Sequence, residues 1–266
     1  MITSMTNPKV KQVVLWRDKA GQRRKDQVFL AEGWKMFGEA PADWIKEVYL
    51  SEKAYEKREG DKELWEKLER TGCELVSEEV LSKMSDTQTP QGILMVLHRP
   101  NYSAEEILSA PGGLFLVLED LQDPGNLGTI MRTGEGAGVN GIFMSKGTVD
   151  LFNPKTVRSS MGSIYRVPFI YADDLQEIMQ KMKNNGIQTF AAHLSGKEYY
   201  TGRSFTGPTA FLIGNEGNGL KQETAALADE RIRIPMAGQL ESLNAAAAAS
   251  ILLYEAARQR RAQGKR

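Results

Sequence analysis

Apolar residues in the second half of the chain occur in short continuous runs separated by polar, glycine-rich segments. Leu114–Leu118 is one such run, typical of a strand buried on both faces. The pattern predicts further strands at 141–145, 187–191, 209–213 and 231–234, and helices at 126–137, 154–161, 173–184, 221–228 and 243–261. This alternation of strands and helices predicts an α/β fold with a parallel sheet covered on both faces.

The first hundred residues also mix strand and helix signals. Strands are predicted at 28–31, 45–50, 73–76 and 91–97, and helices at 8–19 and 62–70, with Asn7 as a possible cap and Pro8 at the first helical position. Chain breakers around Pro100 and Pro111 bracket a linker. We therefore expect a smaller α/β domain at 1–100, a linker at 101–112 and a larger domain at 113–266.

The composition of the 266 residues excludes several classes of site. Cys73 is the only cysteine, so an internal disulfide is impossible, and His98 and His193 are the only histidines, which argues against a metal site. No apolar run reaches the roughly 20 residues needed to span a bilayer, and the start of the chain lacks the apolar core of a signal peptide. We expect a cytoplasmic protein with no membrane partner and no metal.

Charge is balanced overall but clustered locally. The formal net charge is zero, from 34 basic and 34 acidic residues. Residues 52–69 mix both signs at helical spacing, as on a solvated helix face. Two basic clusters are candidates for nucleic-acid contact: Lys9, Lys11, Arg17, Lys19, Arg23, Arg24 and Lys25 near the start, and Arg258, Arg260, Arg261, Lys265 and Arg266 at the end.

One motif points to a dinucleotide but stands in the wrong context. Residues 136–141 match G-x-G-x-x-G. In a dinucleotide-binding fold this motif follows a strand and opens a helix, whose N-terminus receives the pyrophosphate. Here a predicted helix precedes it and a predicted strand follows. The glycines are better explained as the end of a helix that packs closely on a sheet.

Three other segments carry candidate chemistry. In the first, the strand at 114–118 runs through a Pro-Gly turn into a helix that holds Asn126 and Arg132. An apolar stripe on that helix excludes Arg132, and at 100° per residue the two side chains stand roughly 240° apart. Taken alone, the pattern favours Asn126 as a helix cap and Arg132 as a surface charge.

The second and third segments are loops that follow apolar strands. Residues 213–219 contain three glycines, which allow close approach of a ligand to the backbone, and one carboxylate, Glu216; a tight turn with a solvated Glu216 explains them equally well. Ile234-Pro235-Met236 leads to Ser242-Leu-Asn244 and an alanine run at 245–249. Alone, Ser242 is best explained as the cap of the final helix.

In this order, the three segments resemble the SpoU/TrmH family of RNA ribose 2′-O-methyltransferases, which belongs to the SPOUT class. The resemblance covers about residues 114–257. It rests on N-x-G-x-x-x-R at 126–132, I-G-N-E-G-x-G at 213–219, and I-P-M followed by S-L-N at 242–244. The N-terminal part resembles the family's substrate-binding domain, similar to certain RNA-binding ribosomal proteins, through Asn7-Pro8-x-Val10-Lys11 and Phe29-Leu-Ala-Glu-Gly33.

The resemblance implies a trefoil-knotted SPOUT domain, a homodimer, and transfer of a methyl group from S-adenosylmethionine to a ribose 2′-hydroxyl. It implies that RNA is the substrate, with 23S ribosomal RNA favoured over transfer RNA, and that the early basic cluster contacts RNA phosphates. By position, the donor would contact Gly214, Ile234 and Leu243. The catalytic residues would be Arg132, Asn126, Glu216, Ser242 and Asn244.

Within that scheme the expected roles differ. An arginine stays protonated, so Arg132 would bind the target phosphate and stabilise developing alkoxide charge rather than act as a base. Asn126, Ser242 and Asn244 would hold the ribose and the loops, and Glu216 would order its loop or anchor Arg132 or Asn126. Three alternatives stay open: a transfer-RNA methyltransferase, an RNA-binding protein without catalysis, and a nicotinamide-dependent oxidoreductase.

Overall fold

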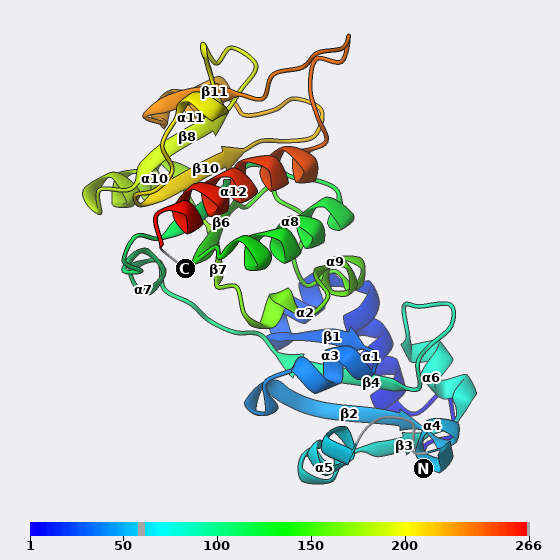
Figure 1. Ribbon diagram of the computed structural model, residues 1–266. Coiled ribbons are helices and arrows are strands. Elements are labelled where there is room, and N and C mark those ends of the chain that lie inside the picture. The colour runs from blue at the N-terminus through cyan, green and yellow to red at the C-terminus, as the bar shows by residue number, and fades with distance from the viewer. Residues whose placement is uncertain (58–61, 265–266) are drawn as a thin grey trace. The chain divides into compact units, whose positions relative to one another are not determined.

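The computed structural model describes residues 1–57 and 62–264 and divides the chain into two compact units. The first comprises Met1–Asn101 and Asp150–Tyr165, and the second comprises Tyr102–Val149 and Arg166–Arg266. Figure 1 gives the element labels. The sequence pattern had placed 150–165 in the second domain and 101–112 in a linker, whereas the structure groups 150–165 with the first unit and forms helix α7 (Ala104–Leu108) in the expected linker. Helices long and apolar enough to cross a membrane are absent from the described ranges.

The first unit is built on a mixed four-stranded sheet in the order β1 (Val28–Glu32), β4 (Ile93–His98), β2 (Ile45–Ser51) and β3 (Glu74–Val76). β4 runs antiparallel to β1 and β2, and β2 runs parallel to β3. Side chains alternate between the faces, so Val28 and Leu30 join one apolar cluster with residues of α1 (Pro8–Asp18) and α6 (Glu78–Met84).

The remaining elements of this unit are short: α2 (Ala20–Asp26), α3 (Trp34–Glu39), α4 (Glu52–Lys57), α5 (Lys62–Thr71), α9 (Pro154–Ser160), and the 3-10 turns η1 (Ala42–Trp44) and η2 (Ser163–Tyr165). The predicted mixed-charge helix at 52–69 corresponds to α4 and α5, and its residues 58–61 lie outside the described part of the chain.

Partly buried ion pairs hold the segment 150–165 in the first unit. Asp150 accepts hydrogen bonds from Arg23 at 2.6 Å and from Arg99 at 3.5 Å. The Arg99 guanidinium also lies 3.9 Å from the ring centroid of Phe152, and Phe152 contacts the ring of Phe29 on β1. These contacts fix the start of the segment against β1, which places α9 beside that strand.

The second unit contains a seven-stranded sheet in which the paired strands of the described residues all run parallel. The order is β7 (Phe169–Ala172), β6 (Gly141–Ser145), β5 (Leu114–Leu118), β10 (Thr209–Ile213), β8 (Gln188–Ala192), β11 (Glu230–Arg233) and β9 (Glu198–Tyr199). Every residue of β5 and β10 is buried, as expected for central strands covered on both faces. The predicted α/β fold with a parallel sheet is confirmed.

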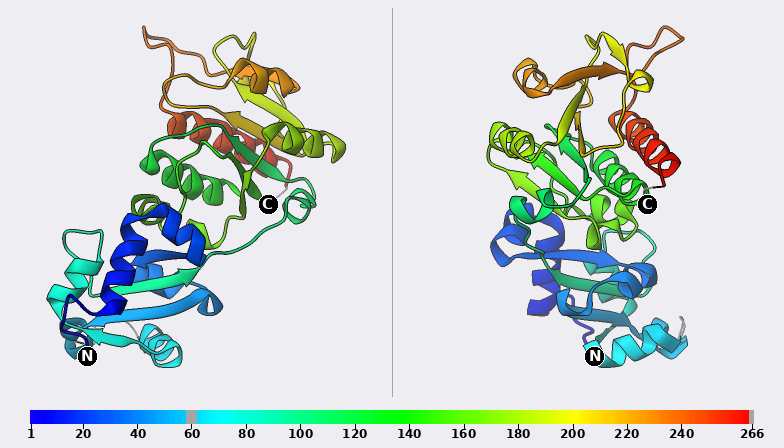
Figure 2. Two further views of the ribbon diagram at one scale, coloured as in Figure 1. Left: turned by 180° about the vertical axis from the view of Figure 1, so that it is seen from behind. Right: turned by 60° about the vertical axis from the view of Figure 1, so that its left-hand side comes forward.

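Helices cover both faces of this sheet (Figure 2). α8 (Pro124–Ala137) and α12 (Ala245–Ala262) pack together on one face, while α7, α10 (Leu175–Asn184) and α11 (Gln222–Leu227) share the core on the other, and η3 (Tyr200–Gly202) follows β9. The alanines of α12 allow this close packing, because Ala245, Ala246, Ala249, Ala256 and Ala257 are all buried within the chain.

The G-x-G-x-x-G segment is structural. Gly138 ends α8 in the left-handed region at φ 82°, and the amide of Val139 donates to the carbonyl of Gly134 at 2.8 Å. β6 then begins at Gly141. This helix-to-strand connection offers no helix N-terminus to a pyrophosphate, which excludes the nicotinamide interpretation.

Candidate active site

The two central strands deliver two of the candidate segments to one edge of the sheet. Leu118 pairs with Ile213 at the carboxyl ends of β5 and β10. Immediately beyond, the amide of Glu119 donates to the carbonyl of Ile213 at 2.9 Å. The buried Glu119 carboxylate then accepts from the Lys221 amide at 2.8 Å and from Thr224 Oγ1 at 2.5 Å. The chain after β5 is therefore locked to the loop after β10, as expected at the ligand-binding edge of a parallel sheet.

The loop at 214–219 requires its first glycine. A Cβ at Gly214 would lie 2.1 Å from the carbonyl carbon of Gly219 and from the amide nitrogen of Leu220. Asn215 and Gly219 exchange both backbone hydrogen bonds, at 3.0 and 2.9 Å, so the loop closes on itself. The Asn215 side chain receives the amides of Gly217 and Asn218 and donates to the carbonyl of Asp120 at 2.8 Å.

Glu216 receives the three donors that surround it at this edge. Its Oε2 accepts from the Gln122 amide at 3.0 Å, and its Oε1 accepts from the Asp123 amide at 3.1 Å and from Asn126 Nδ2 at 3.0 Å. Burial alone would raise the pKa of Glu216, but the hydrogen bonds from Asn126 and from the Gln122 and Asp123 amides outweigh it and hold the pKa below its ordinary value. Glu216 is therefore an ionised anchor for the start of α8.

The third segment joins the same network through Asn244. Its Nδ2 donates to Asn126 Oδ1 at 3.0 Å, while its Oδ1 accepts from the amides of Ala246 and Ala247 at the start of α12. A continuous chain of side-chain hydrogen bonds thus runs from Glu216 through Asn126 to Asn244. It links the starts of α8 and α12 to the loop after β10.

Two cap assignments from the sequence are wrong. The cap of α8 is Asp123, whose Oδ1 accepts from the Asn126 amide at 2.8 Å, so the Asn126 side chain is free to bond Glu216 and Asn244. The cap of α12 is Asn244 and not Ser242. In each helix a side chain must accept from the free amides of the first turn. Asp123 does this for α8 in place of Asn126, and Asn244 does it for α12 in place of Ser242.

A cavity of about 230 Å³ lies beside this network, within the second unit. Gly214, Ile234 and Leu243, the residues expected to contact the donor, line it, and so do Glu216 and Ser242. Asn126 and Asn244 do not line the cavity themselves. Asn126 is hydrogen-bonded to the lining residue Glu216, and Asn244 is hydrogen-bonded to Asn126. The mixture of an apolar lining with a few polar groups is typical of a small-molecule site.

His193, at the carboxyl end of β8, lines the cavity and was missed in the sequence. Its Nδ1 lies 3.1 Å from the Ser195 amide, which can only donate, so the neutral ring carries its proton on Nε2. Burial lowers the pKa of His193, and Arg231 lowers it further. The ring therefore presents a hydrogen-bond donor. Only the strand order, with β8 between β10 and β11, reveals this placement.

Arg132 stands apart from the cavity. It is exposed on α8, outside the buried stripe formed by Leu127, Ile130 and Met131, as the helical spacing predicted. In the part of the chain that the structure describes, Arg132 makes no hydrogen bond or ion pair, and it does not line the cavity. Its guanidinium is available for a ligand outside the chain.

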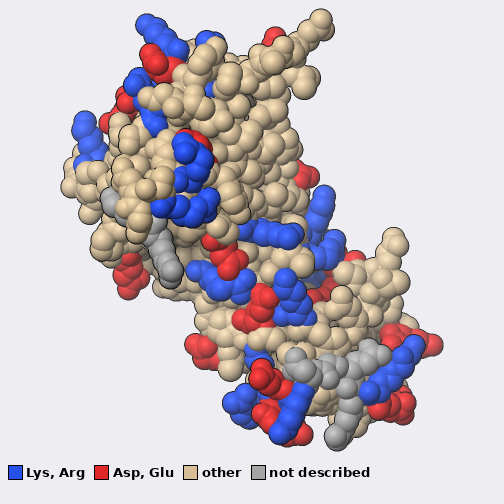
Figure 3. Space-filling model, in the orientation of Figure 1, with Lys and Arg blue, Asp and Glu red and all other residues tan. Residues whose placement is uncertain are grey.

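Several basic residues expected to contact RNA have structural partners instead. Arg23 is buried and donates to Asp150 and to the carbonyls of Trp16 and Arg17. Arg17 donates to Asp18 and to the carbonyls of Lys83 and Ser85. Lys11, Lys19, Arg24 and Lys25 stay exposed. Figure 3 shows basic and acidic side chains interspersed on the face turned to the viewer.

The C-terminal basic cluster is likewise divided. Arg260 donates to the carbonyls of Gly112, Gly113, Phe205 and Gly207. Arg258 pairs with Glu255, and Lys265 and Arg266 lie outside the described residues. Arg260 is thus a structural residue.

Residues 113–254 match the SpoU rRNA Methylase family, and residues 7–95 match the MRM3-like substrate binding domain. The chain is 34% identical to the 23S rRNA (guanosine(2553)-2′-O)-methyltransferase RlmP of Bacillus subtilis, over 95% of this chain and 97% of that protein. The similarity therefore extends across both units.

Two solved structures have the same fold over nearly the whole chain. The AdoMet-bound rRNA methyltransferase from Sinorhizobium meliloti is 33% identical, with a TM-score of 0.85 over 97% of both chains. The SpoU methyltransferase AviRb from Streptomyces viridochromogenes, in complex with the cofactor AdoMet, is 28% identical, with a TM-score of 0.86 over 98% of this chain and 100% of that chain.

Proposed function

Because the chain belongs to the SpoU rRNA methylase family, we propose that it transfers a methyl group from S-adenosylmethionine to a ribose 2′-hydroxyl of 23S ribosomal RNA. The single observation that carries this is the hydrogen-bonded chain Glu216–Asn126–Asn244 beside a cavity lined by Gly214, Ile234 and Leu243. The relative from Bacillus subtilis, which aligns over nearly all of this chain, supports 23S rRNA as the substrate.

The cavity fits the methyl donor chemically. Ile213, Ile232, Ile234 and Leu243 provide an apolar lining for an adenine ring, and the tight backbone at Gly214 keeps the wall free of side chains there. His193, Asn215 and Ser242 also line it and would offer polar groups to the donor. When bound, S-adenosylmethionine supplies a methyl carbon on a positively charged sulfur.

The residues of the chain then act mainly by positioning, since a methyl displacement must be in line with reacting atoms about 3–3.5 Å apart. Glu216 holds Asn126 and the start of α8, and Asn244 holds the start of α12, so both helices are tied together at the mouth of the cavity. Ser242 stands in the loop over the cavity and would contact the ribose. Arg132 would bind the target phosphate and stabilise developing negative charge on the 2′-oxygen.

The exposed position of Arg132 favours a homodimer as the active form. Asn126 and Arg132 are separated by about 9 Å along α8 at 1.5 Å per residue, and Arg132 does not line the cavity of its own chain. We propose that Arg132 serves the active site at a subunit interface. The buried face of α12 is occupied within the chain, so the interface uses other surfaces. The trefoil knot that the resemblance implies, and a cytoplasmic location alongside ribosomal RNA, also belong to this proposal.

The test combines donor binding with methyl transfer. Calorimetry should detect S-adenosylmethionine binding to the whole chain, and tritium from labelled donor should enter an unmodified 23S rRNA transcript. Bulk transfer RNA serves as the competing substrate. Label in transfer RNA alone would show that transfer RNA, and not 23S rRNA, is the substrate. Donor binding without label in either RNA would contradict catalysis and leave only an RNA-binding role.

A further inference from the structure

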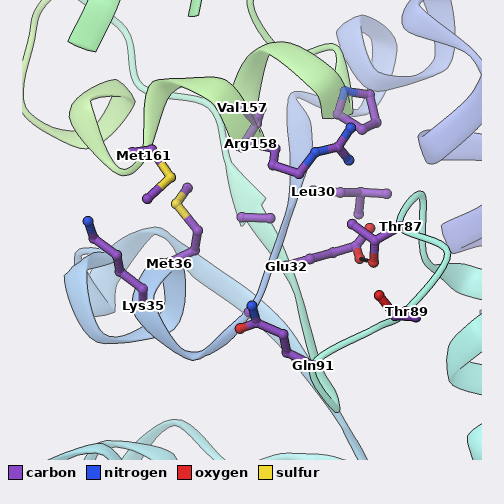
Figure 4. A pocket seen from close by; sticks show the side chains of 13 residues that line it. Leu30, Glu32, Lys35, Met36, Thr87, Thr89, Gln91, Val157, Arg158 and Met161 are labelled. Atoms are coloured by element: carbon purple, nitrogen blue, oxygen red, sulfur yellow. Dashed lines mark hydrogen bonds between the residues drawn. The ribbon is translucent and has the colours of Figure 1, made fainter.

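A second cavity lies in the first unit and belongs to no part of the proposed methyl-transfer site. Its volume is about 160 Å³, and it opens beside the end of β1, α3, α9 and the loop at 87–91 (Figure 4). The lining is formed by Leu30, Ala31, Glu32, Gly33, Lys35, Met36, Thr87, Thr89, Gln91, Pro154, Val157, Arg158 and Met161.

Two parts of the chain build this cavity. Leu30 to Gln91 lie in the stretch that matches the substrate-binding domain, and Pro154 to Met161 lie in the stretch that matches the methylase family, although both belong to the first unit. Residues 154–161 match the methylase family but lie in the first unit, where they complete the cavity. An occupant of the cavity therefore contacts both stretches.

The end of β1 is shaped to bring polar groups to the cavity. Gly33 has φ of +96°, which favours glycine, and the Gln91 side chain lies against it, because a Cβ there would be 2.7 Å from Gln91 Oε1. Gln91 Oε1 accepts from the Trp34 amide at 3.3 Å. Gln91 Nε2 donates no hydrogen bond to any of the described residues. Glu32 accepts from the Asp86 amide and Thr87 Oγ1, at 2.6 and 2.7 Å, which leaves lone pairs on both carboxylate oxygens.

The walls are apolar and the rim is basic. Met36 from α3 and Met161 after α9 converge on one side of the cavity in Figure 4, with Val157 above them. Thioethers pack well on flat aromatic rings. On the rim, Lys35 Nζ lies 3.8 Å from the Glu39 carboxylate. Arg158 donates from Nη1 to Asp86 at 2.8 Å, and its other nitrogens donate to no partner among the residues that the structure describes.

We propose that this cavity binds one unpaired nucleobase of the RNA substrate, with its flanking phosphates on Lys35 and on Arg158, which lie on opposite sides of the rim (Figure 4). A base offers a flat apolar face to the methionines and an edge with donors and acceptors to Glu32 and Gln91, which is how proteins read single-stranded RNA. The rim cations suit phosphate. The inference rests on the proposed function for the identity of the ligand as RNA, and it assigns a site distant in sequence from the methyl-transfer motifs.

The test uses methionine-methyl NMR of the whole chain titrated with each of the four ribonucleoside 5′-monophosphates. The expected result is a saturable shift of the Met36 and Met161 methyl signals, with Met182, buried in the second unit, as the internal reference. Gln91→Ala should weaken binding about fivefold, the weight of one hydrogen bond. The matched control is Gln88→Ala, which alters an exposed glutamine of the same loop that does not line the cavity.

Charge at the rim is tested in the same way. Lys35→Ala should weaken binding, whereas Lys62→Ala, which removes a lysine 90% exposed on α5, should not. Equal shifts with inorganic phosphate alone would overturn the nucleobase assignment, and unshifted Met36 and Met161 signals would overturn the site. Failure of the proposed function is distinguishable, because it would appear as absent methyl transfer while the nucleotide shifts persist.

Discussion

Asn126 donates from its Nδ2 to Glu216 Oε1 at 3.0 Å, and this bond joins residues 90 positions apart in the chain. Through it the loop after β10 holds the first turn of α8 at the mouth of the cavity. Asn244 extends the same network to α12. The three segments singled out in the sequence thus meet through side chains, although no segment alone indicates this.

Glu216→Gln should weaken S-adenosylmethionine binding about tenfold, roughly the weight of one hydrogen bond to a charged group after allowance for solvent screening. An amide can accept through only one of its two terminal atoms, so the Gln122 or Asp123 amide or Asn126 loses its acceptor. Calorimetry measures the change. Glu223→Gln, at an exposed site on α11, is the matched control; equal affinities in the two variants would contradict the anchoring role.

Donor binding should also depend on pH in a defined direction. The pKa of Glu216 is lowered from its ordinary value of 4.5 in the folded chain. The donor binds to the folded chain, so the contribution of the ionised Glu216 is present above its lowered pKa and is lost as the pH falls through that value. Affinity measured downward from pH 7 should show this acidic loss in the native chain. In Glu216→Gln the step should disappear, and a loss centred above pH 5 would assign it to another group.

Gly214→Ala should reduce turnover by about 100-fold, the scale on which a displacement of about 1 Å acts on a positioned reaction. The added Cβ would stand 2.1 Å from the backbone of Gly219 and Leu220, so the loop must move. The control is Gly202→Ala, where a Cβ meets no heavy atom within 4 Å. Steady-state methyl transfer compares the two, and normal turnover in Gly214→Ala would mean that the loop does not shape the donor site.

Arg132→Ala should lower methyl transfer about 100- to 1,000-fold, the usual effect of removing a group that stabilises charge in the transition state. S-adenosylmethionine affinity should stay within twofold of the native value (roughly 0.4 kcal/mol), because Arg132 does not line the cavity. Lys183→Ala, which removes an exposed charge on α10, is the control. Mixing Arg132→Ala chains with Gly214→Ala chains, which are both expected to be poor in turnover, tests the proposed dimer. Recovered activity would place Arg132 at the partner's site, and no recovery would place it at its own.

Arg260→Met should destabilise the second unit by about 2 kcal/mol, since several carbonyl groups lose a charged donor. Those carbonyls belong to Gly112, Gly113, Phe205 and Gly207, which lie on two chain segments before β5 and β10. Thermal unfolding should show a melting point several degrees lower. Arg261→Met alters an exposed neighbour and should leave it unchanged; the same shift in both variants would show that general charge loss is responsible.

The central strands could be predicted from the sequence because their signals are local. The apolar runs at Leu114–Leu118, Gly141–Ser145 and Thr209–Ile213 coincide with β5, β6 and β10. β7 and β9 were missed: Phe169–Ala172 is a short strand with two half-buried residues, and Glu198–Tyr199 is exposed. The short helices α2, α3, α6 and α7 were missed too, since about six residues give too little periodicity to identify a helix.

The site was less accessible because its bonds are long-range. No local pattern shows that Asp123 takes the cap position and leaves Asn126 to Glu216. The strand order that brings His193 to the cavity, and the Asp150 ion pairs that attach 150–165 to the first unit, also depend on tertiary contacts. The sequence predicted too many RNA contacts in the basic clusters, because it does not reveal that Arg23 and Arg260 have partners within the chain.

Mass spectrometry of the nucleosides from a 23S rRNA transcript, treated with the whole chain and S-adenosylmethionine, tests the central claim most directly. We predict one 2′-O-methylnucleoside, formed by the native chain and about 100- to 1,000-fold less by Arg132→Ala. A methyl group found on a base, or a 2′-O-methylnucleoside formed equally by Arg132→Ala, would contradict it.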